Sequence, residues 1–244
     1  MSPDKDYAEF AYYEGFPFID SFYLEVHYGG TDIQNASIRR VLAEKKKPFY
    51  ATGFMSGGII VDNGNIKTIG NVKKYAFEDL NIENAEDYAR VNTLAWIQSY
   101  KGIINDDFLN LINTEEYFEQ FVIRLKNGIG DKSNRPFLLK VDDKPVGVLA
   151  VRESNYPGYE NCGELGAIYL LDCAKGQGYG KILFEKAVKE LKLMGYTKMI
   201  NGCIEGNPAN SFYQHMGGKL IGNKIFKVPN GQELNENMYI YDNI

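Results

Sequence analysis

The sequence predicts a mixed α/β (α+β) fold, in which helices pack on the faces of one mixed sheet. From about residue 70, apolar runs of strand length alternate with longer stretches of helical periodicity. The elements follow the order β-α-α-β-β-β-α-β-α-β-β, so helices lie between strands and are not gathered into one block. Hydrophobic residues make up 44% of the 244 residues and aromatic residues 14%, which suits a packed core and excludes wholesale disorder.

We expect residues 1–69 to form a small α/β appendage, because they do not share the regular α/β series that begins near residue 70. Pro48 ends its helix, and Asn63-Gly64 supplies the positive φ that a tight hairpin turn needs. No motif here indicates a chemistry, so we expect the segment to shape either the substrate side of a site or a homodimer contact. Its expected elements are a strand at 22–28, a helix at 38–47 and a hairpin with strands at 57–61 and 66–69.

Residues 70–244 form the second predicted domain and carry the main sheet. Asn113, with Glu116 three residues later, resembles a capping box, and Pro208 suits the first turn of a helix. On the first helix, apolar residues at helical spacing are expected to form one buried face: Tyr88, Val91, Leu94 and Ala95. The expected strands are 72–77, 137–141, 146–151, 164–171, 199–204, 220–228 and 238–241, and the expected helices are 84–99, 113–126, 180–194 and 208–216.

Charge and the rarer residues exclude several classes of function. A formal net charge of −5 argues against binding nucleic acid through the overall field of the protein. The two histidines, His27 and His215, leave little room for a histidine-based metal cluster. The three cysteines contain no C-x-x-C pair and cannot all pair within the chain, which favours a reducing, cytoplasmic location. No signal peptide is recognisable and no apolar run approaches about 18 residues, so we expect no membrane span.

The most informative stretch is a glycine-rich turn between an expected strand and an amphipathic helix. It reads Lys175-Gly176-Gln177-Gly178-Tyr179-Gly180-Lys181. Backbone N–H groups and the helix dipole favour an anion at such a place, glycine lets a phosphate approach the backbone, and lysines add positive charge. A tight turn with no ligand is the alternative. The spacing matches neither a P-loop nor the G-x-G-x-x-G dinucleotide fingerprint.

The turn does fit the pyrophosphate-loop motif Q/R-x-x-G-x-G/A, with Lys175 in the first position and Gly178 and Gly180 following. On this motif and its flanks, the chain resembles the GCN5-related N-acetyltransferase (GNAT) superfamily over about residues 70–244. The resemblance implies a GNAT-like, mostly antiparallel central sheet with helices on both faces. The flanking matches are 163–171 to the fourth strand, 207–218 to the Asn…Phe-Tyr…Gly motif, and 95–103 to the first helix and acceptor-side loop.

This resemblance implies that the co-substrate is acetyl-coenzyme A and that no metal is needed. The backbone of Leu170, Leu171 and Asp172 would pair with the pantetheine arm as if with another strand, and an N–H near Leu170 would polarise the thioester oxygen. Asn207 would hydrogen-bond the cofactor arm, cap the helix that follows, or do both. The loop amides would hold the pyrophosphate, from Lys175, Gly176, Gln177, Gly178, Tyr179, Gly180 and Lys181.

The same resemblance implies the catalytic groups. Tyr213 matches the tyrosine that protonates the departing thiolate, and packing is its alternative role. Glu164 is the best candidate for the general base, with a solvated edge carboxylate as the alternative. The fifth-strand glutamate of some relatives is Gly202 here, so that route is absent. Trp96 and Tyr100 are candidates to line the acceptor pocket, although aromatics at helical spacing more often belong to the core.

The function that the sequence supports best is transfer of an acetyl group to a primary amine by direct attack in a ternary complex. The acceptor is a small-molecule amine or a peptide N-terminus. A non-catalytic coenzyme A-binding sensor or scaffold is the alternative. The two readings separate at Tyr213, because its retention favours catalysis.

Overall fold

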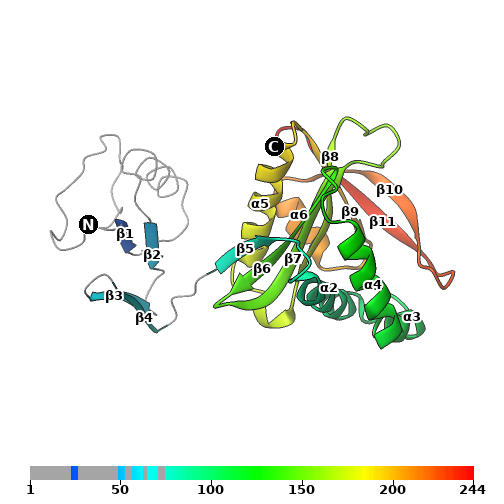
Figure 1. The fold of residues 1–244 in the computed structure, drawn as a ribbon. Helices are drawn as coiled ribbons and strands as arrows, with labels where there is room; N and C mark the ends of the chain where they lie inside the picture. Colours follow the sequence, from blue (N-terminus) through cyan, green and yellow to red (C-terminus); the bar gives the residue numbers. More distant parts are fainter. Residues whose placement is uncertain (1–22, 27–48, 53–56, 63–64, 71–74) are drawn as a thin grey trace. The chain divides into compact units, whose positions relative to one another are not determined.

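The structure is a computed structural model that describes residues 23–26, 49–52, 57–62, 65–70 and 75–244 (Figure 1). The chain divides into two units, Met1–Lys74 and Tyr75–Ile244. In the first unit, β1 (Tyr23–Val26) pairs in parallel with β2 (Phe49–Thr52). The predicted hairpin is confirmed as β3 (Gly57–Asp62) and β4 (Asn65–Gly70), which pair antiparallel. Its turn at 63–64 and the helix predicted at 38–47 lie outside the described residues.

The second unit is built on a seven-stranded sheet with the order β10-β11-β9-β8-β7-β6-β5. Every neighbouring pair is antiparallel except β8 and β9, which are parallel, so the predicted mostly antiparallel mixed sheet is confirmed. The strands are β5 (Tyr75–Asp79), β6 (Asn134–Val141), β7 (Lys144–Glu153), β8 (Gly163–Leu170), β9 (Met199–Ile204), β10 (Lys219–Lys227) and β11 (Glu233–Tyr241). The helices are α2 (Ala85–Tyr100), α3 (Asp106–Ile112), α4 (Glu115–Asn127), α5 (Tyr179–Leu193) and α6 (Ala209–His215), with a 3-10 turn at Asp172–Ala174.

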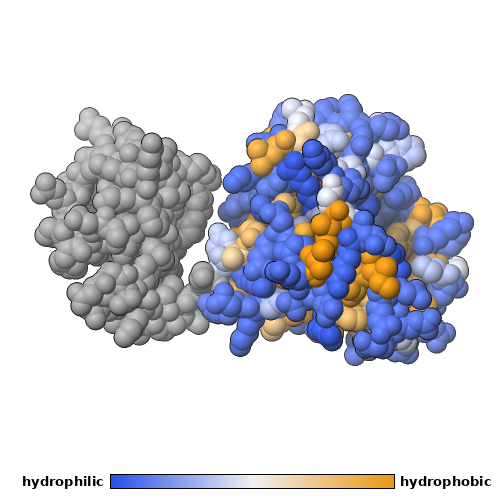
Figure 2. All heavy atoms as spheres, in the orientation of Figure 1, coloured by the Kyte–Doolittle hydropathy of each residue, from blue (hydrophilic) through white to orange (hydrophobic). Residues whose placement is uncertain are grey.

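Helices cover both faces of this sheet because the strands alternate apolar side chains to the two sides. On β6, Phe137 and Leu139 pack into the core under α5, whereas Leu138 packs with Tyr88 of α2 on the opposite face. Figure 1 shows α5 on one side of the strands and α2 with α4 on the other. In the view of Figure 2 the described surface is mainly hydrophilic with scattered apolar side chains, as expected when most apolar residues lie in the two core layers.

The sheet opens between β8 and β9, and this opening positions the site. The two strands pair only at Gly163↔Met199 and Glu164↔Ile200. Beyond Glu164, β8 carries a bulge, since Ala167 pairs with Ala150 and Leu165 with Val151, which leaves Gly166 between them as an extra residue. A bulge bends its strand and ends regular pairing, so β8 and β9 diverge from this point.

Three local predictions were wrong. Leu94 is 43% exposed, because it lies beside the stripe formed by Tyr88, Val91 and Ala95 and not within it. The N-cap of α4 is Thr114 and not Asn113, and its side chain accepts a hydrogen bond from Tyr117 N; because a tyrosine stands at that third helical position, the expected capping box does not form. The last strand begins at residue 233 and not at 238.

Candidate active site

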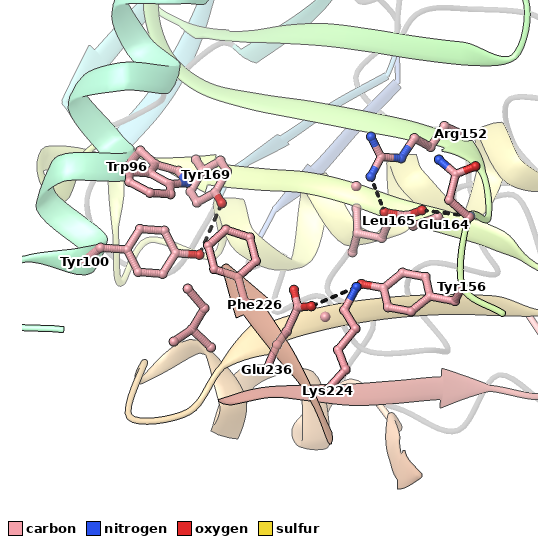
Figure 3. A pocket seen from close by; sticks show the side chains of 14 residues that line it. Trp96, Tyr100, Arg152, Tyr156, Glu164, Leu165, Tyr169, Lys224, Phe226 and Glu236 are labelled. Atoms are coloured by element: carbon pink, nitrogen blue, oxygen red, sulfur yellow. Dashed lines mark hydrogen bonds and ion pairs between the residues drawn. The ribbon is translucent and has the colours of Figure 1, made fainter. Parts of the chain in front are cut away.

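Two adjoining cavities lie at the opening of the sheet. One is a chamber of about 230 Å³, and the other is a narrower slot of about 60 Å³ between β8 and β9. In Figure 3 aromatic side chains lie at one end of the chamber and two ion pairs lie toward the other. The residues that line both cavities, and therefore join them, are Tyr100, Leu165, Gly166, Tyr169 and Gly202.

Tyr213 lines the slot from α6. Its backbone carbonyl accepts hydrogen bonds from Gly218 N at 2.9 Å and from the Tyr241 hydroxyl at 3.2 Å, which fix the end of the helix. Within residues 75–244, no protein group bonds its own hydroxyl. Burial raises the pKa of Tyr213 well above its ordinary value of 10.0, so the phenol keeps its proton across the usual working range.

Asn207 lines the same slot and is 8% exposed. Its Oδ1 accepts a hydrogen bond from Ala209 N at 2.9 Å, which satisfies an N–H at the start of α6. The N-cap residue of α6 is Pro208, so Asn207 satisfies this N–H from the position before the cap and is not itself the N-cap. The side-chain amide nitrogen has no partner within residues 75–244, so its two donors are available to a ligand in the slot.

The glycine-rich turn leads directly into α5. Gly176 and Gly178 have φ of +73° and +84°, and a Cβ built on either meets nothing within 4 Å, so the loop is open on its outer side. The first helical hydrogen bond runs from Ile182 N to the Gly178 carbonyl, which leaves the preceding N–H groups without helical partners. Lys175 Nζ lies 2.7 Å from Asp172 Oδ1, so its charge is partly balanced within the loop.

The two remaining polar side chains of the turn make local contacts. Gln177 Nε2 donates to the Cys173 carbonyl at 2.7 Å, and Lys181 Nζ lies 3.9 Å from Glu185 Oε1. Tyr179 is buried in the core beneath the sheet, so only its backbone is placed to meet a ligand. Gly180 has Phe212 beneath it, since a Cβ there would lie 3.5 Å from the ring.

The end of β8 offers fewer free amides than the sequence suggested. Leu171 N donates to the Val146 carbonyl at 2.9 Å and Asp172 N donates to Gln98 Oε1 at 2.9 Å. Because consecutive residues of a strand point their N–H groups to opposite edges, the N–H of Leu170 points away from β7. The N–H of Leu170 is therefore the best placed of the three to bind a ligand. The N–H of Asp172 can bind one only if the Gln98 side chain moves away.

Glu164 lies at the wall of the chamber and is 3% exposed, so the alternative of a solvated edge carboxylate was wrong. Its Oε1 lies 2.5 Å from Arg152 Nη2 and its Oε2 accepts a hydrogen bond from Asn155 N at 3.4 Å. The hydrogen bond to Glu164 raises the pKa of Arg152 above its ordinary value. The guanidinium thus stays charged and holds the carboxylate in one orientation.

A second ion pair, which the sequence analysis did not identify, faces the same chamber. Glu236 Oε2 on β11 lies 3.1 Å from Lys224 Nζ on β10. Lys224 Nζ also lies 3.9 Å from the centroid of the Tyr156 ring, a cation–π contact. Burial, with the nearby Glu236 charge, raises the pKa of Tyr156, so its hydroxyl stays neutral between the charged groups.

Aromatic residues close the opposite end of the chamber. The rings of Trp96 and Tyr100 lie 4.5 Å apart, and the hydroxyls of Tyr100 and Tyr169 lie 3.2 Å apart. Both predicted substrate residues therefore line the cavity and also pack in an apolar cluster with Phe108, so the two readings hold together. Burial raises the pKa of Tyr100, which keeps this hydroxyl pair neutral.

The chamber residues that no motif singled out reach it in two ways. Lys224 and Glu236 are brought there by strand pairing, at facing positions of β10 and β11. Asn155 and Tyr156 come instead from the loop between β7 and β8. The polar run 233–237 gave no apolar strand signal, although its intermediate burial at alternate positions fits a half-buried strand. The chamber residues that the sequence analysis missed are Arg152, Asn155, Tyr156, Tyr169, Lys224 and Glu236.

Comparisons with known proteins give matches in sequence and in fold. The model of the acetyltransferase (GNAT) family matches residues 97–217. An uncharacterized N-acetyltransferase, YuaI of Bacillus subtilis, is 30% identical over 151 residues, which are 60% of this chain and 82% of that protein. The N-acetyltransferase PaiA of Thermoplasma acidophilum, solved with coenzyme A, superposes with a TM-score of 0.52 at 18% identity, covering 69% of this chain and 99% of that one.

The spermidine/spermine N-acetyltransferase SpeG of Vibrio cholerae superposes with a TM-score of 0.51 at 17% identity, covering 69% of this chain and 92% of that one. At such identities the two solved structures support the fold. Among the residues that the structure describes, no group of three or more His, Cys, Asp or Glu side chains could hold a metal ion. Nor does any helix among those residues have the length and apolarity to cross a membrane.

Proposed function

The chain belongs to the acetyltransferase (GNAT) family, and on that premise we propose that it acetylates a primary amine by direct attack in a ternary complex. Acetyl-coenzyme A is the donor, and the acceptor is a small-molecule amine or a peptide N-terminus. One observation carries the proposal: the slot, which Tyr213 lines, shares wall residues with the chamber, which Glu164 lines. A thioester in the slot and an amine in the chamber then meet at the shared wall.

The residues present suit coenzyme A. The open loop at Gly176 and Gly178 and the free amides at the start of α5 suit a pyrophosphate. The narrow slot between the diverging strands suits a pantetheine arm, with β8 along one side and Asn207 among its lining residues; Leu170 follows on β8, just beyond that lining. Acetyl-coenzyme A supplies an activated acetyl group on a thioester, and the chain supplies orientation and proton transfer.

Tyr213 is the proposed general acid. Its hydroxyl lines the slot, keeps its proton because burial raises its pKa, and has no competing partner among residues 75–244. A proton from this hydroxyl to the leaving sulfur neutralises the charge that develops there. The pKa of an ordinary thiol, about 8.5, is lower than that of Tyr213. The phenol can therefore protonate the leaving sulfur only inside the slot, where desolvation raises the pKa of the thiol as well.

Glu164 is the proposed general base. The carboxylate is held by Arg152 through Oε1 and by Asn155 N through Oε2, and it faces the chamber from the strand that also borders the slot. An acceptor ammonium must lose a proton before it can attack. Glu164 takes that proton directly or through one water, and Arg152 keeps the carboxylate oriented while it does so.

The decisive experiment measures thiol release from acetyl-coenzyme A across a panel of amines, aminoglycosides, polyamines and peptides. Thiol release that depends on the amine, with acetylated product found by mass spectrometry, supports the proposal. The alternative, a non-catalytic coenzyme A-binding module, predicts a coenzyme A-dependent rise in melting temperature with no amine-dependent release. Absence of both signals contradicts both functions.

A further inference from the structure

The chamber arranges its charges by depth. Its two carboxylates are enclosed, with Glu164 and Glu236 side chains 5% and 13% exposed. Their cationic partners lie toward solvent, with Arg152 and Lys224 side chains 45% and 43% exposed. The four charges cancel, so the chamber is not a simple acidic trap for cations. A molecule that enters meets positive charge first and negative charge further in.

Glu236 reaches the chamber because Gly202 makes room for it. The two residues lie on the adjacent strands β11 and β9, where Met238 pairs with Gly202. A Cβ at position 202 would lie 2.2 Å from Glu236 Oε1 and 2.6 Å from the Tyr156 hydroxyl. Such an approach is not tolerated by real atoms, so the missing side chain at Gly202 is a condition for the carboxylate to occupy this place.

The ion pair of Glu236 is incompletely satisfied. Its buried Oε2 is 3.1 Å from Lys224 Nζ, yet within residues 75–244 no donor reaches it with hydrogen-bond geometry. Lys224 lies at the facing position of β10 on a flexible stem, over the ring of Tyr156. A buried carboxylate oxygen gains more from a well-directed charged donor than from a loosely placed one. The lysine is therefore the exchangeable member of the pair.

We propose that the acceptor is a small zwitterion, an amine that carries a carboxylate a few bonds away, and that it binds by exchange into the Lys224–Glu236 ion pair. Its ammonium replaces Lys224 on Glu236 and gives up a proton through water to Glu164 before it attacks the thioester, and its carboxylate takes Lys224 Nζ. The inference rests on the proposed acetyltransferase function and names the substrate class of that site.

Charge balance favours this class over a plain cation. A monoamine that displaced Lys224 would leave one more positive charge than negative in a half-enclosed space, and a polyamine would leave at least two more, whereas a zwitterion leaves every charge paired. Size agrees with the inference. A cavity of about 230 Å³ is smaller than the roughly 300 Å³ at which pockets for drug-sized ligands begin. It holds a molecule of amino-acid size more readily than a long peptide or an aminoglycoside.

The test compares matched acceptors. β-Alanine, γ-aminobutyrate and the common α-amino acids are each assayed beside the corresponding amide and the corresponding amine without the carboxyl group. For at least one series we expect kcat/KM of the zwitterion to exceed that of its amide by about ten- to a hundredfold, the value of one charge-assisted hydrogen bond. Equal kcat/KM for acid and amide in every series, or no zwitterion above background, overturns the inference.

Variants of the pair locate the effect. Lys224→Met should erase the preference for acid over amide, Lys224→Arg should restore it, and Glu236→Gln should raise KM for every amine. Lys227→Met is the matched control, because Lys227 also lies on β10 and pairs across to Glu233 of β11 at 2.9 Å but does not line the chamber. A preference for acid that survives in Lys224→Met refutes the exchange.

A separate readout distinguishes this inference from the proposed function. The melting temperature is measured with coenzyme A alone and then with coenzyme A plus γ-aminobutyrate or its amide. If coenzyme A alone does not raise the melting temperature, the proposed function itself is contradicted. A normal coenzyme A shift and amine-dependent thiol release, without discrimination between acid and amide, contradict only the zwitterionic acceptor.

Discussion

Replacing Gly178 tests the proposed pyrophosphate loop with the least disturbance to the fold. Gly178 is the N-cap of α5, has a φ of +84°, and has open space where a Cβ would be built. A glutamate there places a negative charge among the amides proposed to hold the pyrophosphate. The matched control is Gly178→Ala, which carries the same backbone strain without the charge.

The two variants separate the effect of backbone strain on folding from the effect of the added charge on coenzyme A binding. Either substitution forces an L-residue into the left-handed region at a cost of about 1–2 kcal/mol in folding free energy. Two unit charges about 4 Å apart repel by about 4 kcal/mol at an effective dielectric near 20. The loop is exposed and screened, so we take about half of this value. That is roughly a thirtyfold rise in the Kd of coenzyme A for Gly178→Glu beyond that for Gly178→Ala.

Isothermal titration of coenzyme A at low and high salt is the assay, with urea unfolding to confirm that both variants lose similar stability. The gap between the two Kd values should narrow at high salt, because screening weakens the repulsion. Kd values for Gly178→Glu and Gly178→Ala within threefold of each other at low salt would refute the placement of the pyrophosphate in this loop.

Three further predictions follow from the same structure. Tyr213→Phe should lower the single-turnover rate by about a hundredfold or more with little change in the Kd of coenzyme A; unchanged rates would make Tyr213 a packing residue. Burial alone would raise the pKa of Glu190, but its bonds to Lys186 at 2.7 Å and Arg135 at 3.0 Å hold the pKa below 4.5. The stability that the ionised Glu190 contributes is therefore present above about pH 4.5 and lost as the pH falls below it. Because Arg135 is 36% exposed and solvent screens its charge, we expect Glu190→Gln to lower the free energy of unfolding in urea by only about 2 kcal/mol at neutral pH. Burial also raises the pKa of several tyrosines above 10.0, so their contribution is intact below about pH 10 and the urea midpoint should fall as the pH rises further; a midpoint that stays flat to about pH 11 would contradict this assignment. These tyrosines are Tyr88, Tyr100, Tyr156, Tyr213 and Tyr241.

The backbone of the second unit was largely predictable because its strands and helices have strong local signals. Residues 199–204 were predicted as a strand and are β9 to the residue, since a short apolar run is bounded by turns on both sides. The strands predicted at 137–141 and 146–151 form the hairpin of β6 and β7, and the two aspartates between them, Asp142 and Asp143, have positive φ of 49° and 61°. Such signals lie within a few residues of each other and need no knowledge of the tertiary structure.

The chamber was not predictable by the same means. Arg152 and Glu164 are 12 residues apart in the sequence and meet only because β7 and β8 pair at these positions. The Lys224–Glu236 pair depends equally on the register of β10 and β11. Gly202 was read from the sequence as a missing carboxylate. The structure shows that its lack of a side chain admits the carboxylate of Glu236 from the neighbouring strand, a relation that no sequence spacing encodes.

The opening between β8 and β9 connects the stability of the sheet to its proposed chemistry. The interrupted parallel ladder leaves backbone groups of β8 without a strand partner on the β9 side, among them those of Ile168, which lines the slot. A pantetheine arm that pairs there would complete the ladder in the way a further strand would. Tyr213 lines the slot and Glu164 lines the adjoining chamber, so the two proposed proton-transfer groups lie in the two cavities at this opening. The proposed ligand binding and catalysis therefore both depend on one structural irregularity, and a saturating ligand should stabilise the second unit by about 2.7 kcal/mol at a hundred times its Kd.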